Sequence, residues 1–211
     1  MASLRTVGLL WAGVLVAIVM GLRFRAKQNA GHGARGGKIS NPKVLWLFFA
    51  IWFWFVECAV LAFEPSLPSS YRLIVGVHAL SMWLRGAAEM FMLHVTKNWR
   101  PPIGIGHDAL CIATIIGLAV WSGPELTTVG AWSWWAPALV LMLVFSLVVE
   151  LLYAALFFKA VEGKTTGDDG IWFADAESER FKRINRITFA CNTPQVLFQL
   201  ALLGAMTLSV H

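Results

Sequence analysis

The chain has 211 residues, of which 58% are hydrophobic and 14% are charged, and its formal net charge is +5. A soluble domain of this length needs a larger polar share to cover its surface, so the composition predicts an integral membrane protein. A basic chain can also indicate nucleic-acid binding. We do not expect a nucleic-acid partner, because the basic residues gather in the segments between apolar runs.

Six segments are long and apolar enough, or nearly so, to cross a hydrocarbon core about 30 Å thick as helices. In chain order they are residues 7–22, 44–63, 71–95, 108–122, 135–158 and 187–209, and the fourth is the shortest. The sequence therefore predicts an all-α polytopic membrane protein. We expect residues 1–211 to form one domain, a bundle of six transmembrane helices.

The distribution of basic residues predicts how this bundle is oriented. Fourteen of the 17 Lys and Arg lie between spans one and two, three and four, or five and six, and only Arg5 and Arg72 lie on the opposite side. By the positive-inside rule, both termini are expected on the non-cytoplasmic side of a bacterial cytoplasmic (inner) membrane. Strong positive charge follows the first apolar run, so we interpret 7–22 as a retained span and not as a signal peptide.

The short segment between the third and fourth spans is expected to be a stiff turn. Pro101 and Pro102 disfavour helix at this point. Asp108 follows and is well placed to cap the start of the fourth helix. His107 is expected beside it at the inner interface.

The segment 159–186 is the only long polar part of the chain. Its GKTT sequence lacks the glycine that a phosphate-binding loop requires, because Phe158 stands at that position. Residues 175–186 are expected to form a helix below the membrane, with Glu179 four residues before Arg183 on one face. Such a projection could bind a protein partner, whereas the basic loops are expected to contact membrane lipids.

Charged and strongly polar side chains inside the spans are the candidate functional residues. They are costly in hydrocarbon and therefore normally face the bundle interior, where they find partners. On the third span, His78, Arg85 and Glu89 lie within about 20° of one line along the helix, because each residue of an α-helix is rotated by about 100° from the one before it. The candidates for ligand binding or proton relay are Glu57, His78, Arg85, Glu89, Glu150, Asn192, Gln195 and Gln199.

Arg85 is expected to pair with a carboxylate. Glu89 lies four residues further along the same helix, and Glu150 lies at a comparable depth across the bundle. The resulting network either forms a functional polar cavity or only fixes the packing of the helices. His78 is either part of a proton-relay couple with Glu57 or a neutral imidazole bonded within the bundle.

Cofactor chemistry is weakly supported by the sequence. A haem with two axial histidines is disfavoured, because only His78 is well inside a span, whereas His94 and His107 could meet only at the interface. No metal site is expected, since the histidines are scattered in depth. The cofactor, if there is one, and any catalytic residue stay unidentified.

Three functional hypotheses follow from this pattern. The first is an intramembrane polar site that binds or translocates a small solute, a proton or a lipid-like ligand. The second is an intramembrane acid–base enzyme that acts on a lipid or isoprenoid substrate, with Glu57, His78 and Glu89 as candidate groups. The third is a non-catalytic subunit or assembly factor of a membrane complex. No inverted repeat is detectable, which counts against a secondary transporter of that design.

Overall fold

The computed structural model describes residues 4–27, 29–30, 40–46, 48, 52–96, 101–123, 135–160 and 179–209. Within these ranges the chain is helical and contains no strand, so the expected all-α class is confirmed. The polar segment 161–178, where we expected part of a partner-binding surface, lies outside the described residues.

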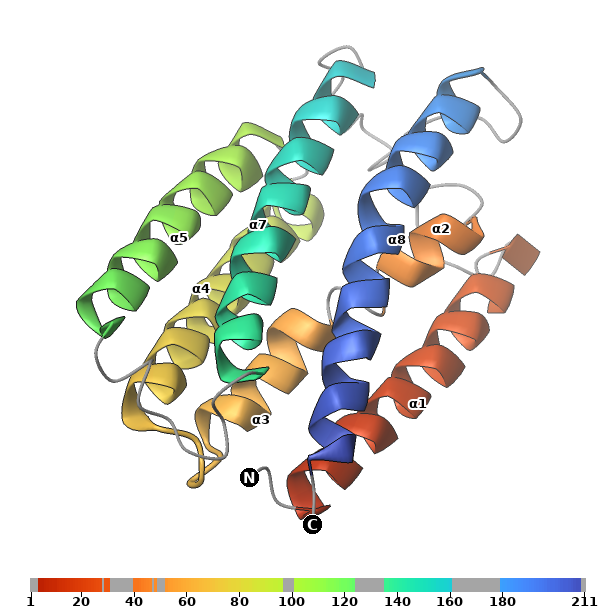
Figure 1. The fold of residues 1–211 in the computed structure, drawn as a ribbon. Helices are drawn as coiled ribbons and strands as arrows, with labels where there is room; N and C mark the ends of the chain where they lie inside the picture. The colour runs from red at the N-terminus through yellow and green to blue at the C-terminus, as the bar shows by residue number, and fades with distance from the viewer. Residues whose placement is uncertain are drawn as a thin grey trace.

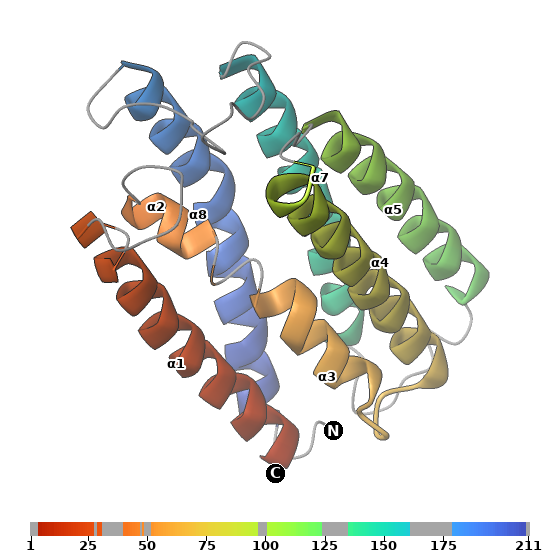
Figure 2. The same ribbon diagram turned by 180° about the vertical axis from the view of Figure 1, so that it is seen from behind.

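The fold is a bundle of long helices and a few short ones. In chain order the elements are α1 (Leu4–Lys27), α2 (Asn41–Leu45), the π-helix η3 (Phe53–Glu57), α3 (Cys58–Ala62), α4 (Ser69–His94), α5 (Pro101–Trp121), α7 (Trp135–Ala160) and α8 (Glu179–Leu208). The start of α1 and the end of α8 lie at the same end of the bundle (Figures 1 and 2). Helix α7 packs against both α5 and α8.

Within the described ranges, four helices are long and apolar enough to cross a membrane. They cover Leu4–Lys27, Ile103–Trp121, Pro137–Ala160 and Phe181–Leu208, in α1, α5, α7 and α8. These helices coincide with the first, fourth, fifth and sixth expected spans. The described structure thus has the helices of an integral membrane protein, and α4, which carries the polar face of the third expected span, runs beside them with 26 residues.

Two expected boundaries were wrong, and both errors concern the start of a helix. Helix α5 begins at Pro101, so the two prolines open the helix instead of preventing it. Proline is tolerated in the first turn because the N–H groups there have no intrahelical partner. Asp108 therefore lies inside α5 and does not cap it.

The last helix also begins earlier than expected. Helix α8 starts at Glu179, so the described part of the expected helical projection and the sixth span are one continuous helix. At its start Lys182 Nζ lies 2.7 Å from Glu179 Oε1, so the ion pair of Glu179 is with Lys182.

The second expected span is not one regular α-helix. Residues Phe53–Glu57 form a π-helix that continues directly into α3. The carbonyl oxygen of Phe55 accepts a hydrogen bond from Trp83 Nε1 of α4 at 3.1 Å, and the two aromatic rings pack edge to face with their centroids 5.0 Å apart. Single π-turns are often found near functional sites, and this one ends on Glu57.

Helix α1 packs closely against the second expected span. A Cβ added at Gly13 would lie 1.9 Å from the ring of Trp52, and one added at Gly21 would lie 2.8 Å from the ring of Phe48. Both glycines therefore permit an approach that no other residue would allow without a shift of the ring. The hydrophobic core lies between α1, η3, α3, α4, α5, α7 and the end of α8.

Candidate functional site

A buried cluster of ion pairs joins α4 to α5. Arg85 Nε donates to Glu89 Oε1 at 3.0 Å, and Arg85 Nη1 donates to Asp108 Oδ1 at 2.5 Å. The side chain of Asp108 is fully buried and that of Arg85 is 11% exposed. The expected pair of Arg85 with Glu89 is present, as spacing of four residues on a helix favours. The partnership with Asp108 was missed, because Asp108 was expected at the end of a helix.

The surface of α5 is shaped to receive the guanidinium group. A Cβ added at Gly104 would lie 2.9 Å from Arg85 Nη2 and 3.6 Å from Glu89 Oε1. Glycine at this position lets the arginine lie directly against the helix backbone. The same turn of α5 carries no such constraint at Gly106, where an added Cβ would meet nothing within 4 Å.

His107 adds a proton-binding group to the cluster. Its Nε2 lies 3.0 Å from the backbone carbonyl oxygen of Ser81, and its Nδ1 lies 3.1 Å from Asp108 Oδ1. A carbonyl oxygen only accepts, so Nε2 carries a proton. Nδ1 then faces a carboxylate oxygen, and a hydrogen bond between them requires a second proton on one of the two atoms. His107 and Asp108 are therefore close enough to share a proton when one is bound at that contact.

Glu150 on α7 is a further carboxylate close to this cluster. It is 1% exposed, and its Oε1 accepts from Trp46 Nε1 at 2.9 Å. It interacts electrostatically with Arg85 and Asp108, although no hydrogen bond joins it to either. Glu150 was expected as one of two carboxylates available to Arg85, beside Glu89. In the structure Asp108 takes that position, and Glu150 is held by an indole instead.

Helix α8 presents a row of buried amides to the bundle interior. Gln195 Nε2 donates to Ser146 Oγ at 2.9 Å, and Gln199 Nε2 donates to Glu57 Oε1 at 3.1 Å. Asn192 Nδ2 donates to a backbone carbonyl one turn earlier in its own helix. The side-chain carbonyl oxygens of all three amides are buried and have no hydrogen-bond partner among the described residues. These oxygens can accept from a ligand or from water.

His78 is buried and does not meet Glu57. Its Nδ1 lies 3.9 Å from Cys111 Sγ, and its Nε2 has no partner among the described residues. Glu57 accepts from Gln199, and no hydrogen bond joins it to His78, so the proton-relay couple that was one of two interpretations of His78 is not formed by direct contact. His94 is exposed at the end of α4 and lies outside the network.

The polar groups form a series through the bundle. Glu57 contacts Gln199, and Gln195, one helical turn away on α8, contacts Ser146. Glu150 follows one turn further along α7 and interacts electrostatically with the Arg85 cluster. A step of one turn spans about 6 Å, which exceeds a hydrogen bond, so the side chains alone do not form an unbroken chain.

Comparison of the chain with protein-family models, with curated proteins and with solved structures found no match. Among the described residues, no group of three or more His, Cys, Asp or Glu side chains is arranged to hold a metal ion. The geometry of the polar cluster is therefore the basis for a functional proposal.

Proposed function

We propose that this chain is a six-span protein of a bacterial inner membrane that translocates protons through its bundle. Helix α4 supports the span count, because 26 residues rise about 39 Å and its low hydropathy is explained by the inward-facing charges. The segment that ends in η3 and α3 supplies the remaining span. The basic inner loops orient both termini to the non-cytoplasmic side.

The observation that carries the proposal is the position of His107 between two oxygen atoms. Its Nε2 lies against the backbone carbonyl oxygen of Ser81 and its Nδ1 against Asp108 Oδ1, so a proton on Nδ1 would lie within hydrogen-bonding reach of a carboxylate. His107 is 19% exposed, so its ring is accessible from outside the bundle. A proton can therefore enter at His107 and pass to a carboxylate that is fully buried.

The balance of charge supports the same function. One arginine lies among three carboxylates, Glu89, Asp108 and Glu150, so the four groups would carry a formal charge of −2 if all were ionised. A net charge of this kind costs free energy in a medium of low dielectric constant. Binding of protons is the simplest way to neutralise it.

The geometry favours a proton over an anionic ligand. Arg85 already donates to Glu89 and to Asp108, so an anion at Arg85 would lie beside two carboxylates and be repelled by them. The amide oxygens of α8 and the buried Glu57 extend the polar series beyond Glu150. Water molecules between successive turns would complete a path for protons.

Proton flux into liposomes tests the proposal. The full chain is reconstituted with an internal pH-sensitive dye, and a potassium gradient with valinomycin supplies the driving potential. We expect Glu150→Gln and Asp108→Asn to lower the initial rate at least about tenfold. Glu179→Gln is the matched control, because that side chain is 83% exposed outside the bundle.

Two results would overturn the proposal. One is a wild-type rate no higher than that of protein-free vesicles. The other is an unchanged rate in the variant that combines Arg85→Met with Gln at positions 89 and 150. The second result would mean that the cluster only fixes helix packing.

A further inference from the structure

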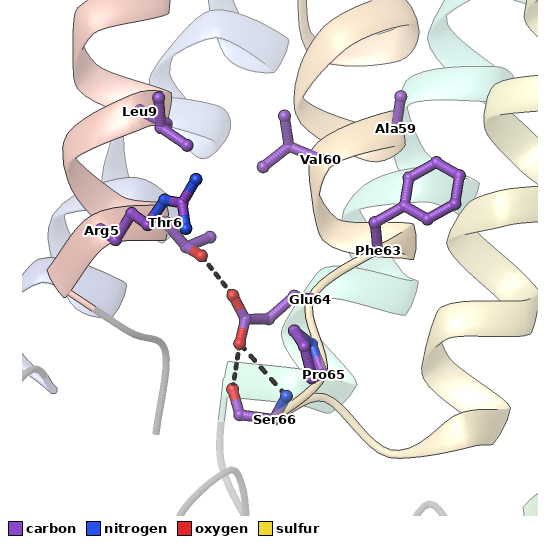
Figure 3. A pocket seen from close by; sticks show the side chains of 9 residues that line it. All are labelled: Arg5, Thr6, Leu9, Ala59, Val60, Phe63, Glu64, Pro65 and Ser66. Atoms are coloured by element: carbon purple, nitrogen blue, oxygen red, sulfur yellow. Dashed lines mark hydrogen bonds between the residues drawn. The ribbon is translucent and has the colours of Figure 1, made fainter.

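A second candidate site lies away from the polar interior, between the start of α1 and the end of α3 (Figure 3). It is a cavity of about 750 Å³, within the range of roughly 300–1,000 Å³ that is usual for small-molecule sites. Leu9 of α1 forms one apolar wall, and Val60 and Phe63 form the facing wall. Leu9 is 53% and Phe63 is 85% exposed, so the cavity opens sideways onto the surface that faces lipid.

A fixed negative charge closes the other end of this cavity. Glu64 is only 5% exposed, and its Oε1 accepts from the backbone N–H of Ser66 at 3.2 Å and from the Ser66 hydroxyl at 2.5 Å. Its other oxygen accepts from the Thr6 hydroxyl. Burial tends to raise the pKa of Glu64, but these hydrogen bonds outweigh burial and hold the pKa below its ordinary value. The carboxyl group is therefore a carboxylate at neutral pH.

A positive charge lies on the facing helix. Arg5 lines the cavity from α1, is exposed, and makes no ion pair or hydrogen bond with the described residues. Figure 3 shows its guanidinium group on the α1 side of the cavity, with Glu64 at the base of the gap. The site thus offers one cation, one anion and an apolar wall, at the level where the helices end.

We propose that this cavity binds one membrane phospholipid with a zwitterionic headgroup that bears a primary amine. Arg5 binds the phosphate, since a guanidinium group matches phosphate geometry. Glu64 accepts from the ammonium group, and an acyl chain lies along Leu9, Val60 and Phe63. The cation and the anion of the site each meet a group of opposite charge in a zwitterionic headgroup. An anionic headgroup would leave Glu64 without a positive partner, so the site favours the zwitterionic lipid. The proposal is independent of proton translocation.

Native mass spectrometry of the full chain in mild detergent tests the site. Phosphatidylethanolamine and phosphatidylglycerol with identical acyl chains are added in equal amounts. We expect the wild-type chain to retain the ethanolamine lipid about fivefold better. This ratio of affinities is what one ion pair at a partly exposed site contributes. Glu64→Gln should abolish this preference, and Arg5→Gln should lower the retention of both lipids.

Two further variants separate the site from general lipid adhesion and from a loss of fold. Val60→Trp fills the cavity and should lower the retention of both lipids, whereas Leu15→Trp, on an exposed part of α1 outside the cavity, should not. Thr6→Val removes one hydrogen bond to Glu64 but leaves both charges, so it should keep the preference. Equal retention of the two lipids by the wild-type chain, or unchanged retention in Val60→Trp, would overturn the proposal.

Discussion

Arg85 and Asp108 lie on different helices, 23 residues apart in the chain, and Nη1 of one is 2.5 Å from Oδ1 of the other. The same Asp108 oxygen faces His107, and the other Asp108 oxygen is buried without a partner among the described residues. The contact of α5 with α4 and the charge of the cluster therefore both involve this one carboxylate. Substitutions at this contact and around it test its role.

We expect Arg85→Met alone to lower the free energy of unfolding by about 3–5 kcal/mol, because it leaves the buried carboxylate of Asp108 without its cation. Asp108→Leu alone should cost less, because Arg85 keeps its ion pair with Glu89. The double variant should recover a large part of this loss, since two apolar side chains replace the pair. Denaturant unfolding in detergent, followed by tryptophan fluorescence, gives the coupling energy. If the loss in the double variant equals the sum of the losses in the two single variants, Arg85 and Asp108 do not interact directly.

Two glycines in one turn of α5 should respond differently to the same substitution. Gly106→Ala should stabilise the protein by about 0.5–1 kcal/mol, because alanine favours helix and the added methyl group meets nothing. Gly104→Ala introduces the same methyl group 2.9 Å from Arg85 Nη2, whose position is fixed by two carboxylates. We expect this variant to be destabilised relative to Gly106→Ala by about 1 kcal/mol or more, measured as thermal unfolding under identical conditions.

Ser146 serves as the common acceptor for two buried donors. Trp54 Nε1 and Gln195 Nε2 both donate to its hydroxyl oxygen, at 2.5 and 2.9 Å. Ser146→Ala would leave both donors unpaired, at about 1–3 kcal/mol each. Ser209→Ala is the matched control, because the Ser209 hydroxyl only donates to a carbonyl of its own helix end. Equal unfolding midpoints for the two variants would argue against the shared acceptor.

The stability of the contact between α1 and the end of α3 should depend on pH. Hydrogen bonds from Ser66 and Thr6 outweigh the effect of burial and lower the pKa of Glu64 in the folded protein. A lowered pKa means that Glu64 contributes stability above its unfolded value of about 4.3, and that this contribution is lost as pH falls through the folded value. The difference in unfolding temperature between wild type and Glu64→Gln should therefore be present at pH 7 and disappear in acid. A difference that is constant with pH would contradict the ionised contact.

The sequence predicted the apolar helices well and the interrupted segment poorly. Helices α1, α5, α7 and α8 were found because a long apolar run reports directly on a spanning helix. The π-helix at Phe53–Glu57 was missed, since hydropathy contains no information on whether a turn holds one extra residue. The span boundaries failed where polar residues continue a helix beyond the apolar run, as at Glu179.

The sequence predicted most residues of the candidate site but few of the hydrogen-bond partners that they have in the structure. A signal for Asp108 was present, because Gly104, Asp108 and Cys111 share one face if the helix starts at Pro101. The expectation that the prolines disfavour helix concealed it. The bond of His107 to a backbone carbonyl and the bond of Glu150 to Trp46 depend on how helices meet in space, and no sequence pattern reports on that.

The π-helix accommodates one extra residue in a wider turn, closed by the hydrogen bond from the Cys58 N–H to the Phe53 carbonyl oxygen. Deleting one residue from Phe53–Glu57 would therefore allow a regular α-helix while the residues on either side keep their faces. The contact that changes is the one made from within the turn, the hydrogen bond from Trp54 to Ser146. A chain one residue shorter at this point would form a more regular helix and lose the aim of one indole at the polar interior.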